Sequence, residues 1–138
     1  MRGYVASLTL KNYPGVDIFA LNPRNNKQVA VQVKTINKPS APPARFGQAP
    51  MGSYFLPEAI GDDPDRPFVF VTITPDCYAR FFIVPNESVA AISDQERRDY
   101  FEYVRSKGRT IKDVQPRMIS LQSLQPFEDK WERLGLDD

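Results

Sequence analysis

Hydrophobic and polar residues alternate along three segments near the start of the chain, a pattern typical of half-buried β-strands. The segments are 3–10, 16–21 and 29–35. Successive side chains of a strand point to opposite faces, so in the third segment the valines share one face. The opposite face carries Ala30, Gln32 and Lys34. Asparagine and proline in residues 22–26 favour a turn, and the second and third segments are therefore expected to form an antiparallel hairpin.

The middle of the chain contains two further apolar segments that follow a proline-rich stretch. Six prolines between residues 36 and 66 exclude a continuous helix there. Within this stretch, residues 53–56 (SYFL) are expected to dock on the core. Residues 68–74 (FVFVTIT) predict a central strand, and residues 78–84 predict its hairpin partner.

Helical periodicity is confined to the last third of the chain. Residues 87–92 predict a short turn, after which Ser93 caps a helix over residues 94–107 that ends at Gly108. Its apolar positions predict one buried stripe, formed by Tyr100, Phe101 and Val104. Residues 118–124 are expected to be extended. Pro126 is expected to start a last helix, with Trp131 anchoring it in the core.

These elements predict a single α+β domain over residues 1–138, with an antiparallel sheet of about five strands. No apolar run approaches the roughly 20 residues that cross a bilayer, so no membrane partner is expected. The one cysteine, Cys77, cannot form an internal disulfide, which favours a reducing compartment and a cytoplasmic location. Its place in a turn predicts a small exposed residue.

The chain contains no histidine, which restricts the chemistry it can perform. Ser-His-Asp and Cys-His catalysis are excluded within this chain, as is a zinc site with histidine ligands. Hard cations bound by oxygen ligands remain available, and so does lysine chemistry. An enzyme with this sequence is therefore expected to use carboxylate, lysine and a Mg²⁺-like ion, or to have its active site completed by another chain.

Charge is distributed unevenly along the chain. Residues 1–50 contain seven basic side chains and one acidic side chain, whereas the remaining 88 residues contain 11 basic and 16 acidic ones. A cationic half suits a phosphate-facing surface. Basic residues clustered on solvated edges would give the same numbers, and both interpretations stay open here.

The predicted hairpin places Asp17 at the start of one strand and Lys34 near the end of its neighbour. A metal-binding carboxylate beside a lysine on paired strands is suited to cleaving a phosphodiester. The segment PGVD…QVK resembles the active-site hairpin of the PD-(D/E)xK nuclease superfamily, which has the restriction-endonuclease-like fold. The stretches FVFVTI, FFIVPNESVA and WERLGL resemble the elements that follow this hairpin in small, mostly uncharacterised prokaryotic members.

The resemblance implies a mixed sheet of about five strands with flanking helices, in a fold that lacks its first helix. It implies that Asp17, Gln32 and Lys34 are catalytic and that Asp17, Gln32 and the Val33 carbonyl bind Mg²⁺ or Mn²⁺. Gln32 stands where the family usually has Glu or Asp, although glutamine occurs there in some relatives, including Mrr-type restriction enzymes. The substrate implied is DNA, and its phosphates are expected to contact Lys11, Arg24, Lys27 and Lys38.

Other interpretations of the same residues stay open. Asp17 can be a turn-stabilising residue, and Lys34 an edge charge that discourages strand pairing. The chain can then be a catalytically inactive nuclease-fold module that binds nucleic acid or a protein partner. A sheet without its first helix invites a homodimer or a partner protein to cover it. The loop over residues 62–65 contains three acidic residues, Asp62, Asp63 and Asp65. This loop is either simply solvated or donates a metal ligand.

Overall fold

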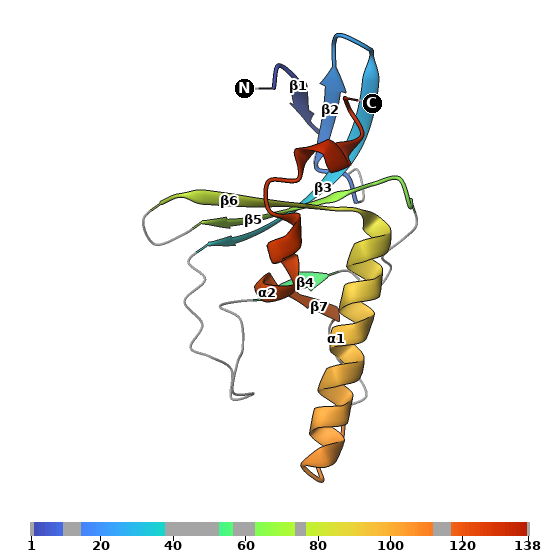
Figure 1. The fold of residues 1–138 in the computed structure, drawn as a ribbon, viewed down its shortest axis with the longest axis vertical. Coiled ribbons are helices and arrows are strands. Elements are labelled where there is room, and N and C mark those ends of the chain that lie inside the picture. Colours follow the sequence, from blue (N-terminus) through green and yellow to red (C-terminus); the bar gives the residue numbers. More distant parts are fainter. Residues whose placement is uncertain are drawn as a thin grey trace.

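The computed structural model describes residues 2–9, 15–37, 53–56, 63–73, 77–111 and 117–137. A five-stranded sheet forms its centre, with the strand order β1-β2-β3-β5-β6 (Figure 1). These strands are β1 Val5–Leu8, β2 Ile18–Asn22, β3 Lys27–Asn37, β5 Phe68–Ile73 and β6 Ala79–Val84. A second, two-stranded sheet consists of β4 Ser53–Leu56 and β7 Arg117–Ser120. The helical elements are α1 Asn86–Ser106, α2 Leu121–Leu124 and the 3₁₀ turns η1 Gln125–Phe127 and η2 Trp131–Leu134.

The predicted hairpin is present as β2 and β3, which pair antiparallel with Ile18 opposite Val31. Asn26 has φ 57° in the connecting turn, a left-handed conformation that asparagine tolerates. The buried side chain of Asn22 fixes the turn, because its Oδ1 accepts a hydrogen bond from the Arg24 N–H at 3.0 Å. Its Nδ2 donates to the Leu136 carbonyl at 2.8 Å and so ties the hairpin to the C-terminal segment.

The central pairing of the sheet is parallel, between β3 and β5, with Gln32 opposite Phe68. The antiparallel sheet expected from strand periodicity is therefore wrong at this position, and the mixed sheet implied by the family resemblance is confirmed. Residues 38–67 separate the two strands, which is long enough for the chain to return to the starting end of β3 before β5 begins. β6 then pairs antiparallel with β5, as predicted.

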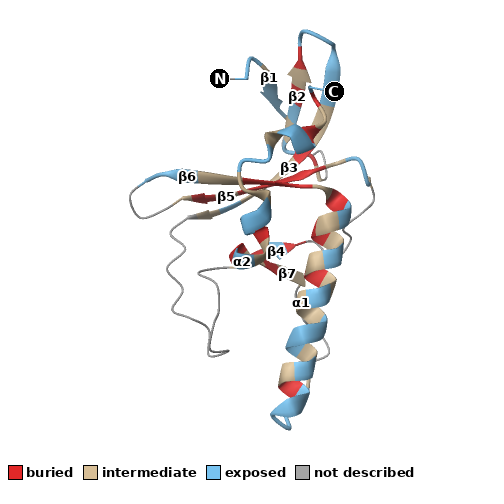
Figure 2. Ribbon diagram, viewed as in Figure 1, coloured by how far each residue is buried: buried red, intermediate tan, exposed pale blue. Residues whose placement is uncertain are grey.

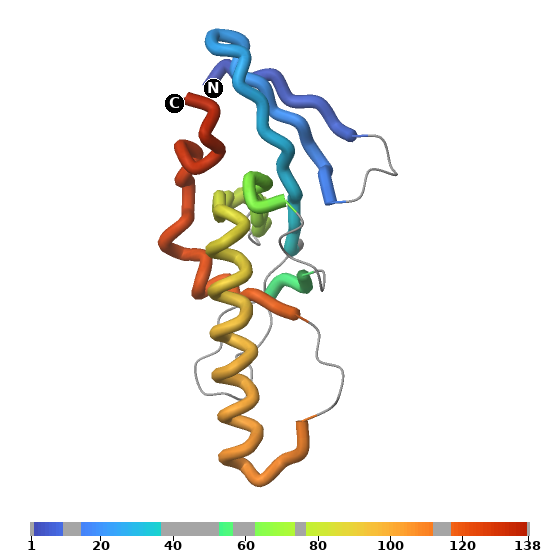
Figure 3. The backbone as a smooth tube through the Cα atoms, turned by 90° about the vertical axis from the view of Figure 1, so that its right-hand side faces the viewer, coloured from blue at the N-terminus to red at the C-terminus, as the bar shows by residue number. Residues whose placement is uncertain are grey.

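Two hydrophobic clusters pack on opposite faces of the sheet (Figures 1 and 2). The larger lies on the side of α1, α2, β4 and β7, and its buried members are Tyr54, Leu56, Phe68, Phe70, Phe82, Val84, Val89, Ile119, Leu121 and Leu124. The smaller cluster joins the meander to the C-terminal segment, with Leu134 and Leu136 against Val31 and Val69. The predicted valine face of β3 belongs to this second cluster. Figure 3 shows the C-terminal segment running beside the β1–β2–β3 meander, with both ends of the chain close together.

One continuous helix, α1, replaces the short turn and separate capped helix expected over residues 87–107. The helix begins earlier because the Pro85 carbonyl accepts the Val89 N–H at 3.1 Å and Val89 is fully buried. Ser93 therefore caps nothing. It is buried within α1, where its Oγ donates to the Ala90 carbonyl at 3.1 Å. Gly108 follows the helix with φ 65°, so the predicted end is confirmed.

The buried stripe predicted for α1 is only partly present. Val104 is buried and Phe101 half-buried, whereas Tyr100 is exposed. The reason is the position of the helix, since its C-terminal half extends away from the sheet and is mostly solvent-exposed (Figure 2).

The C-terminal region also differs from the prediction. The extended segment expected over residues 118–124 ends at Ser120, whose Oγ accepts the Ser123 N–H at 3.3 Å and caps α2. The last helix is replaced by η1 and η2. Asp129 separates them with φ 55° and donates its N–H to the Phe81 carbonyl at 2.9 Å, so pairing with β6 interrupts the helix. Trp131 is half-buried and packs on Phe81, with ring centroids 5.4 Å apart.

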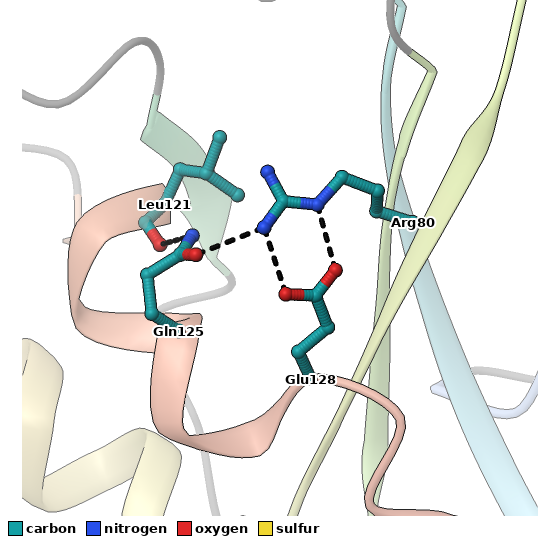
Figure 4. Close-up of polar contacts among 4 residues, drawn as sticks. All are labelled: Arg80, Leu121, Gln125 and Glu128. Carbon is teal, nitrogen blue, oxygen red and sulfur yellow. Dashed lines mark hydrogen bonds and ion pairs between the residues drawn. The ribbon is translucent and has the colours of Figure 1, made fainter.

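Arg80 joins this C-terminal region to the sheet through a two-pronged ion pair with Glu128 (Figure 4). Its Nε and Nη2 donate to the two carboxylate oxygens at 2.7 and 2.8 Å. Nη2 also donates to Gln125 Oε1 at 2.9 Å, and Gln125 Nε2 donates to the Leu121 carbonyl. One guanidinium thus holds the end of α2 and the segment after η1 against β6.

Burial in the core is expected to determine how much a phenylalanine contributes to stability, and a pair of substitutions tests this. Phe70 is fully buried and its ring contacts those of Tyr54 and Phe68, whereas Phe55 is 65% exposed. We expect Phe70→Ala to lower the free energy of unfolding by about 3–5 kcal/mol. Phe55→Ala is expected to change it by no more than about 0.5 kcal/mol. Urea denaturation of both variants measures the difference, and equal losses would contradict the described core.

The Arg80–Glu128 pair predicts a pH dependence of stability. Hydrogen bonding to Arg80 lowers the pKa of Glu128 below its ordinary value of 4.5, so the folded protein binds this proton less readily than the unfolded chain does. Its stabilising contribution is complete above about pH 4.5 and is lost as the pH falls through the lowered pKa. Thermal melts are therefore expected to show a smaller acid-induced loss for Glu128→Gln than for the unmodified chain. Parallel curves for the two proteins would refute a stabilising role for the pair.

Candidate active site

Asp17 lies immediately before β2, and hydrogen bonds from two neighbouring segments fix it there. Its N–H donates to the Val31 carbonyl of β3 at 2.9 Å, and its carbonyl accepts the Thr9 N–H at 3.0 Å. Its carboxylate Oδ2 accepts the Val33 N–H at 2.7 Å. The side chain of Asp17 thus adds one more hydrogen bond to β3, next to the bond that its backbone N–H makes. The Asp17 carboxylate therefore bonds the neighbouring strand at the Val33 peptide.

Two side chains hold the turn that precedes Asp17. Thr9 Oγ1 donates to the Val16 carbonyl at 2.6 Å, which continues the contact between the end of β1 and this turn. On the other side, Arg66 Nη1 donates to the Gly15 carbonyl at 3.1 Å. Sequence reasoning identified neither residue. In both contacts the acceptor is a backbone carbonyl of another segment. A backbone carbonyl is present at every residue, so no residue type in the sequence indicates such a contact.

Gln32 and Lys34 lie on the same face of β3, as predicted, and both are half-buried. Gln32 is opposite Phe68 and Lys34 opposite Phe70 on β5, whose rings belong to the larger cluster. Partners on adjacent strands point to the same face of a sheet, so both residues lie at the margin of that cluster. The backbone N–H of Asp17 donates to the Val31 carbonyl and its carboxylate accepts the Val33 N–H, so Asp17 lies beside residues 31–33 of β3. Asp17, Gln32, Val33 and Lys34 therefore lie at the same end of the hairpin.

The oxygen atoms at this end of the hairpin are of the kinds that a hard divalent cation accepts as ligands. The Val33 hydrogen bond uses one lone pair of Asp17 Oδ2, and the other lone pairs of this carboxylate can bind an ion. The Gln32 amide and the Val33 carbonyl are oxygen ligands of the kind that Mg²⁺ and Ca²⁺ accept. This set carries a single negative charge. Among the residues that the structure describes, no three histidine, cysteine, aspartate or glutamate side chains are grouped to hold a metal.

Lys34 supplies the positive charge at this end of the hairpin. The ion pairs found in the described parts of the chain join Arg2 to Asp137, Arg66 to Asp63, Arg80 to Glu128 and Arg117 to Asp94. Neither Lys34 nor Asp17 takes part in them. Lys34 therefore has no acidic partner within 4.0 Å in the described residues, and its ammonium can act on an anionic ligand.

The residues predicted to contact nucleic acid are not gathered at this site. Arg24 lies in the β2–β3 turn and Lys27 begins β3, so both are at the opposite end of the hairpin from Gln32. Gln32 comes five positions after Lys27 in the strand, which corresponds to about 17 Å. Lys11 and Lys38 lie outside the described residues.

The acidic loop expected near residues 62–65 has a structural role in its described part. Asp63 pairs with Arg66, with Oδ2 and Nη2 3.3 Å apart, and Asp65 is exposed. Asp62 lies outside the described residues. Cys77, predicted in a turn, is exposed and has φ 64°.

Comparisons with protein-family models, with curated proteins and with solved structures found no match to this chain. Within the described ranges, no helix combines the length and the apolar character that crossing a membrane requires.

The hydrogen bond between Asp17 and Val33 makes a testable contribution to stability. We expect Asp17→Ala to lower the free energy of unfolding by about 1 kcal/mol, because the Val33 N–H loses its partner. Asp17→Asn keeps an oxygen acceptor and is expected to be close to neutral. Denaturation curves and hydrogen exchange of the Val33 amide measure the effect. Equal exchange of this amide in all three proteins would contradict the described contact.

Proposed function

We propose that this chain is a metal-dependent nuclease-like domain that hydrolyses phosphodiester bonds in DNA, with the restriction-endonuclease-like core of the PD-(D/E)xK superfamily. The observation that carries the proposal is the contact between the Asp17 carboxylate and the Val33 N–H at 2.7 Å. It brings the acid of the PGVD segment beside the QVK segment across two paired strands. The mixed five-stranded sheet around the hairpin agrees with the coarse fold that the resemblance implies.

Each residue of the site has a distinct role in this proposal. Asp17, the Gln32 side chain and the Val33 carbonyl would hold Mg²⁺ or Mn²⁺. The ion supplies positive charge at the phosphate and lowers the pKa of a bound water. Lys34 contributes a second positive charge that stabilises the charge developing on the phosphate in the transition state. The buried rings of Phe68 and Phe70 beside Gln32 and Lys34 keep one side of the site apolar.

The glutamine at position 32 weakens the site compared with an acidic residue there. An amide oxygen is a neutral ligand, so Asp17 contributes the only full negative charge of the three-residue set. Electrostatic attraction for a divalent ion is correspondingly smaller. Weak cleavage is therefore part of the proposal. Replacing Gln32 by glutamate adds a charge and is expected to strengthen Mn²⁺ binding by about tenfold, equivalent to about 1.4 kcal/mol.

Metal binding and cleavage by the purified chain test the proposal. Isothermal titration calorimetry is expected to detect Mn²⁺ binding that Asp17→Asn abolishes, although this variant keeps the hydrogen-bond acceptor for Val33. Asp65→Asn is the matched control, because it removes the same charge from an exposed residue of the 63–66 turn. Mn²⁺ is also expected to raise the melting temperature of the unmodified chain but not that of Asp17→Asn.

Cleavage is measured on plasmid DNA with Mg²⁺ or Mn²⁺ and with EDTA as the metal-free control. The proposal predicts slow, metal-dependent cleavage that Asp17→Asn and Lys34→Ala abolish. Mn²⁺ binding that is the same in Asp17→Asn and in the unmodified chain would refute the assigned site. DNA binding without metal binding or cleavage would instead support the alternative function, a catalytically inactive module of the same fold.

A further inference from the structure

Arg66 connects the segment before β5 to the turn before Asp17, across 51 positions of sequence. Its Nη1 donates to the Gly15 carbonyl at 3.1 Å, and its Nη2 lies 3.3 Å from Asp63 Oδ2. Only 20% of the Arg66 side chain is exposed. A half-exposed arginine on a surface loop would lose much of such an interaction to water, whereas this guanidinium is largely shielded.

Asp63 holds the guanidinium in place from within the same turn. Its backbone carbonyl accepts the Arg66 N–H at 3.1 Å, and its Oδ1 accepts the Asp65 N–H at 3.1 Å. The other carboxylate oxygen, Oδ2, faces Arg66 Nη2. The turn over residues 63–66 is thus closed by its own hydrogen bonds, and Arg66 extends from it in one defined direction.

Gly15 receives this contact in a conformation that suits glycine. Its φ is 74°, in the left-handed region, and a Cβ atom at this position would lie 2.6 Å from Arg66 Nη1. A side chain at position 15 would therefore strain the backbone and displace the guanidinium at the same time. The close approach requires a glycine two residues before Asp17.

The next residue, Pro67, contacts the other strand of the site. Its carbonyl accepts the Gln32 N–H at 3.2 Å, immediately before β5 begins to pair with β3. Consecutive residues 66 and 67 thus bind the turn that precedes Asp17 and the backbone of Gln32. One segment therefore contacts both strands of the site.

We propose that Arg66 is a positioning residue for Asp17. By holding the Gly15 carbonyl, its guanidinium sets the direction in which the chain leaves the turn, and the Asp17 carboxylate then points at the Val33 N–H beside Gln32. This inference rests on the proposed function only where it concerns metal binding. The orientation of Asp17 is a property of the folded chain and can be measured without any metal.

Two measurements on the same variants test the proposal. In the ¹⁵N-labelled protein, the chemical shift of the Val33 amide reports the hydrogen bond to Asp17. Titration with Mn²⁺ measures the affinity of the proposed metal site. Arg66→Ala is expected to shift the Val33 amide proton upfield towards its position in Asp17→Ala, and to weaken Mn²⁺ binding about tenfold or more. Arg66→Lys keeps one donor for the Gly15 carbonyl and is expected to recover part of both effects.

Arg80→Ala is the matched control, because Arg80 also binds a carboxylate but joins β6 to the C-terminal region. It is expected to lower the melting temperature while leaving the Val33 resonance and the Mn²⁺ affinity unchanged. An unshifted Val33 amide in folded Arg66→Ala would overturn the proposal, even if the variant were less stable. If Arg66→Ala does not fold, Asp63→Asn is used instead, because it weakens the ion pair that holds the Arg66 guanidinium. This variant must shift the Val33 resonance, and an unchanged resonance would refute the proposal.

The two proposals fail in different ways. If the unmodified chain binds no Mn²⁺ but Val33 responds to Arg66→Ala, the metal-dependent nuclease is refuted and the positioning of Asp17 by Arg66 is supported. If Mn²⁺ binds at Asp17 but neither reading changes in Arg66→Ala, the site is supported and the role of Arg66 is refuted.

Discussion

The parallel pairing of β3 with β5 is the constraint on which the rest of the structure depends. It joins the β1–β2–β3 meander to the β5–β6 hairpin in one sheet and fixes which residues of β3 face each side. With Gln32 opposite Phe68, the valines of β3 face the C-terminal segment while Gln32 and Lys34 face the larger cluster. A shift of one residue would exchange the two faces and bury Lys34 among leucines. The same pairing sets Pro67 beside Gln32 and Arg66 beside Gly15.

Asp17 combines a structural contact with the chemistry proposed for it. Its carboxylate accepts the Val33 N–H, which stabilises the start of β2, and the same contact holds a negative charge beside the Val33 peptide, where the metal site is proposed. The structural role therefore does not compete with metal binding, since a carboxylate has more lone pairs than this hydrogen bond uses. The two roles separate in Asp17→Asn, which keeps the acceptor and removes the charge. Gln32 makes the charge of Asp17 more important, because the amide at position 32 is neutral where an acidic residue would add a second negative charge.

Residue patterns predicted the local elements well and the long-range contacts poorly. Alternation located the meander and brought Asp17, Gln32 and Lys34 to one end, and continuous apolar runs located the β5–β6 hairpin. Alternation could not give the parallel pairing, which depends on the path of a long connection.

The helices were predicted less well than the strands. Ser93 is not a cap, because α1 begins before it, and the burial of Val89 that favours this earlier start is a tertiary effect. The last helix was wrong because Asp129 pairs with β6. Arg66 was missed because its partner is a distant backbone carbonyl, with no side-chain type to indicate it.

Paramagnetic broadening by Mn²⁺ tests the central claim most directly, because it locates the ion without requiring cleavage. In the ¹⁵N-labelled chain, substoichiometric Mn²⁺ is expected to broaden the amide resonances of Asp17, Gln32 and Val33 first, and Asp17→Asn is expected to remove this effect. Broadening centred elsewhere, for example on the acidic residues Asp94 and Glu96 of α1, would contradict the account. So would the absence of any localised broadening at Mn²⁺ concentrations that saturate other weak sites.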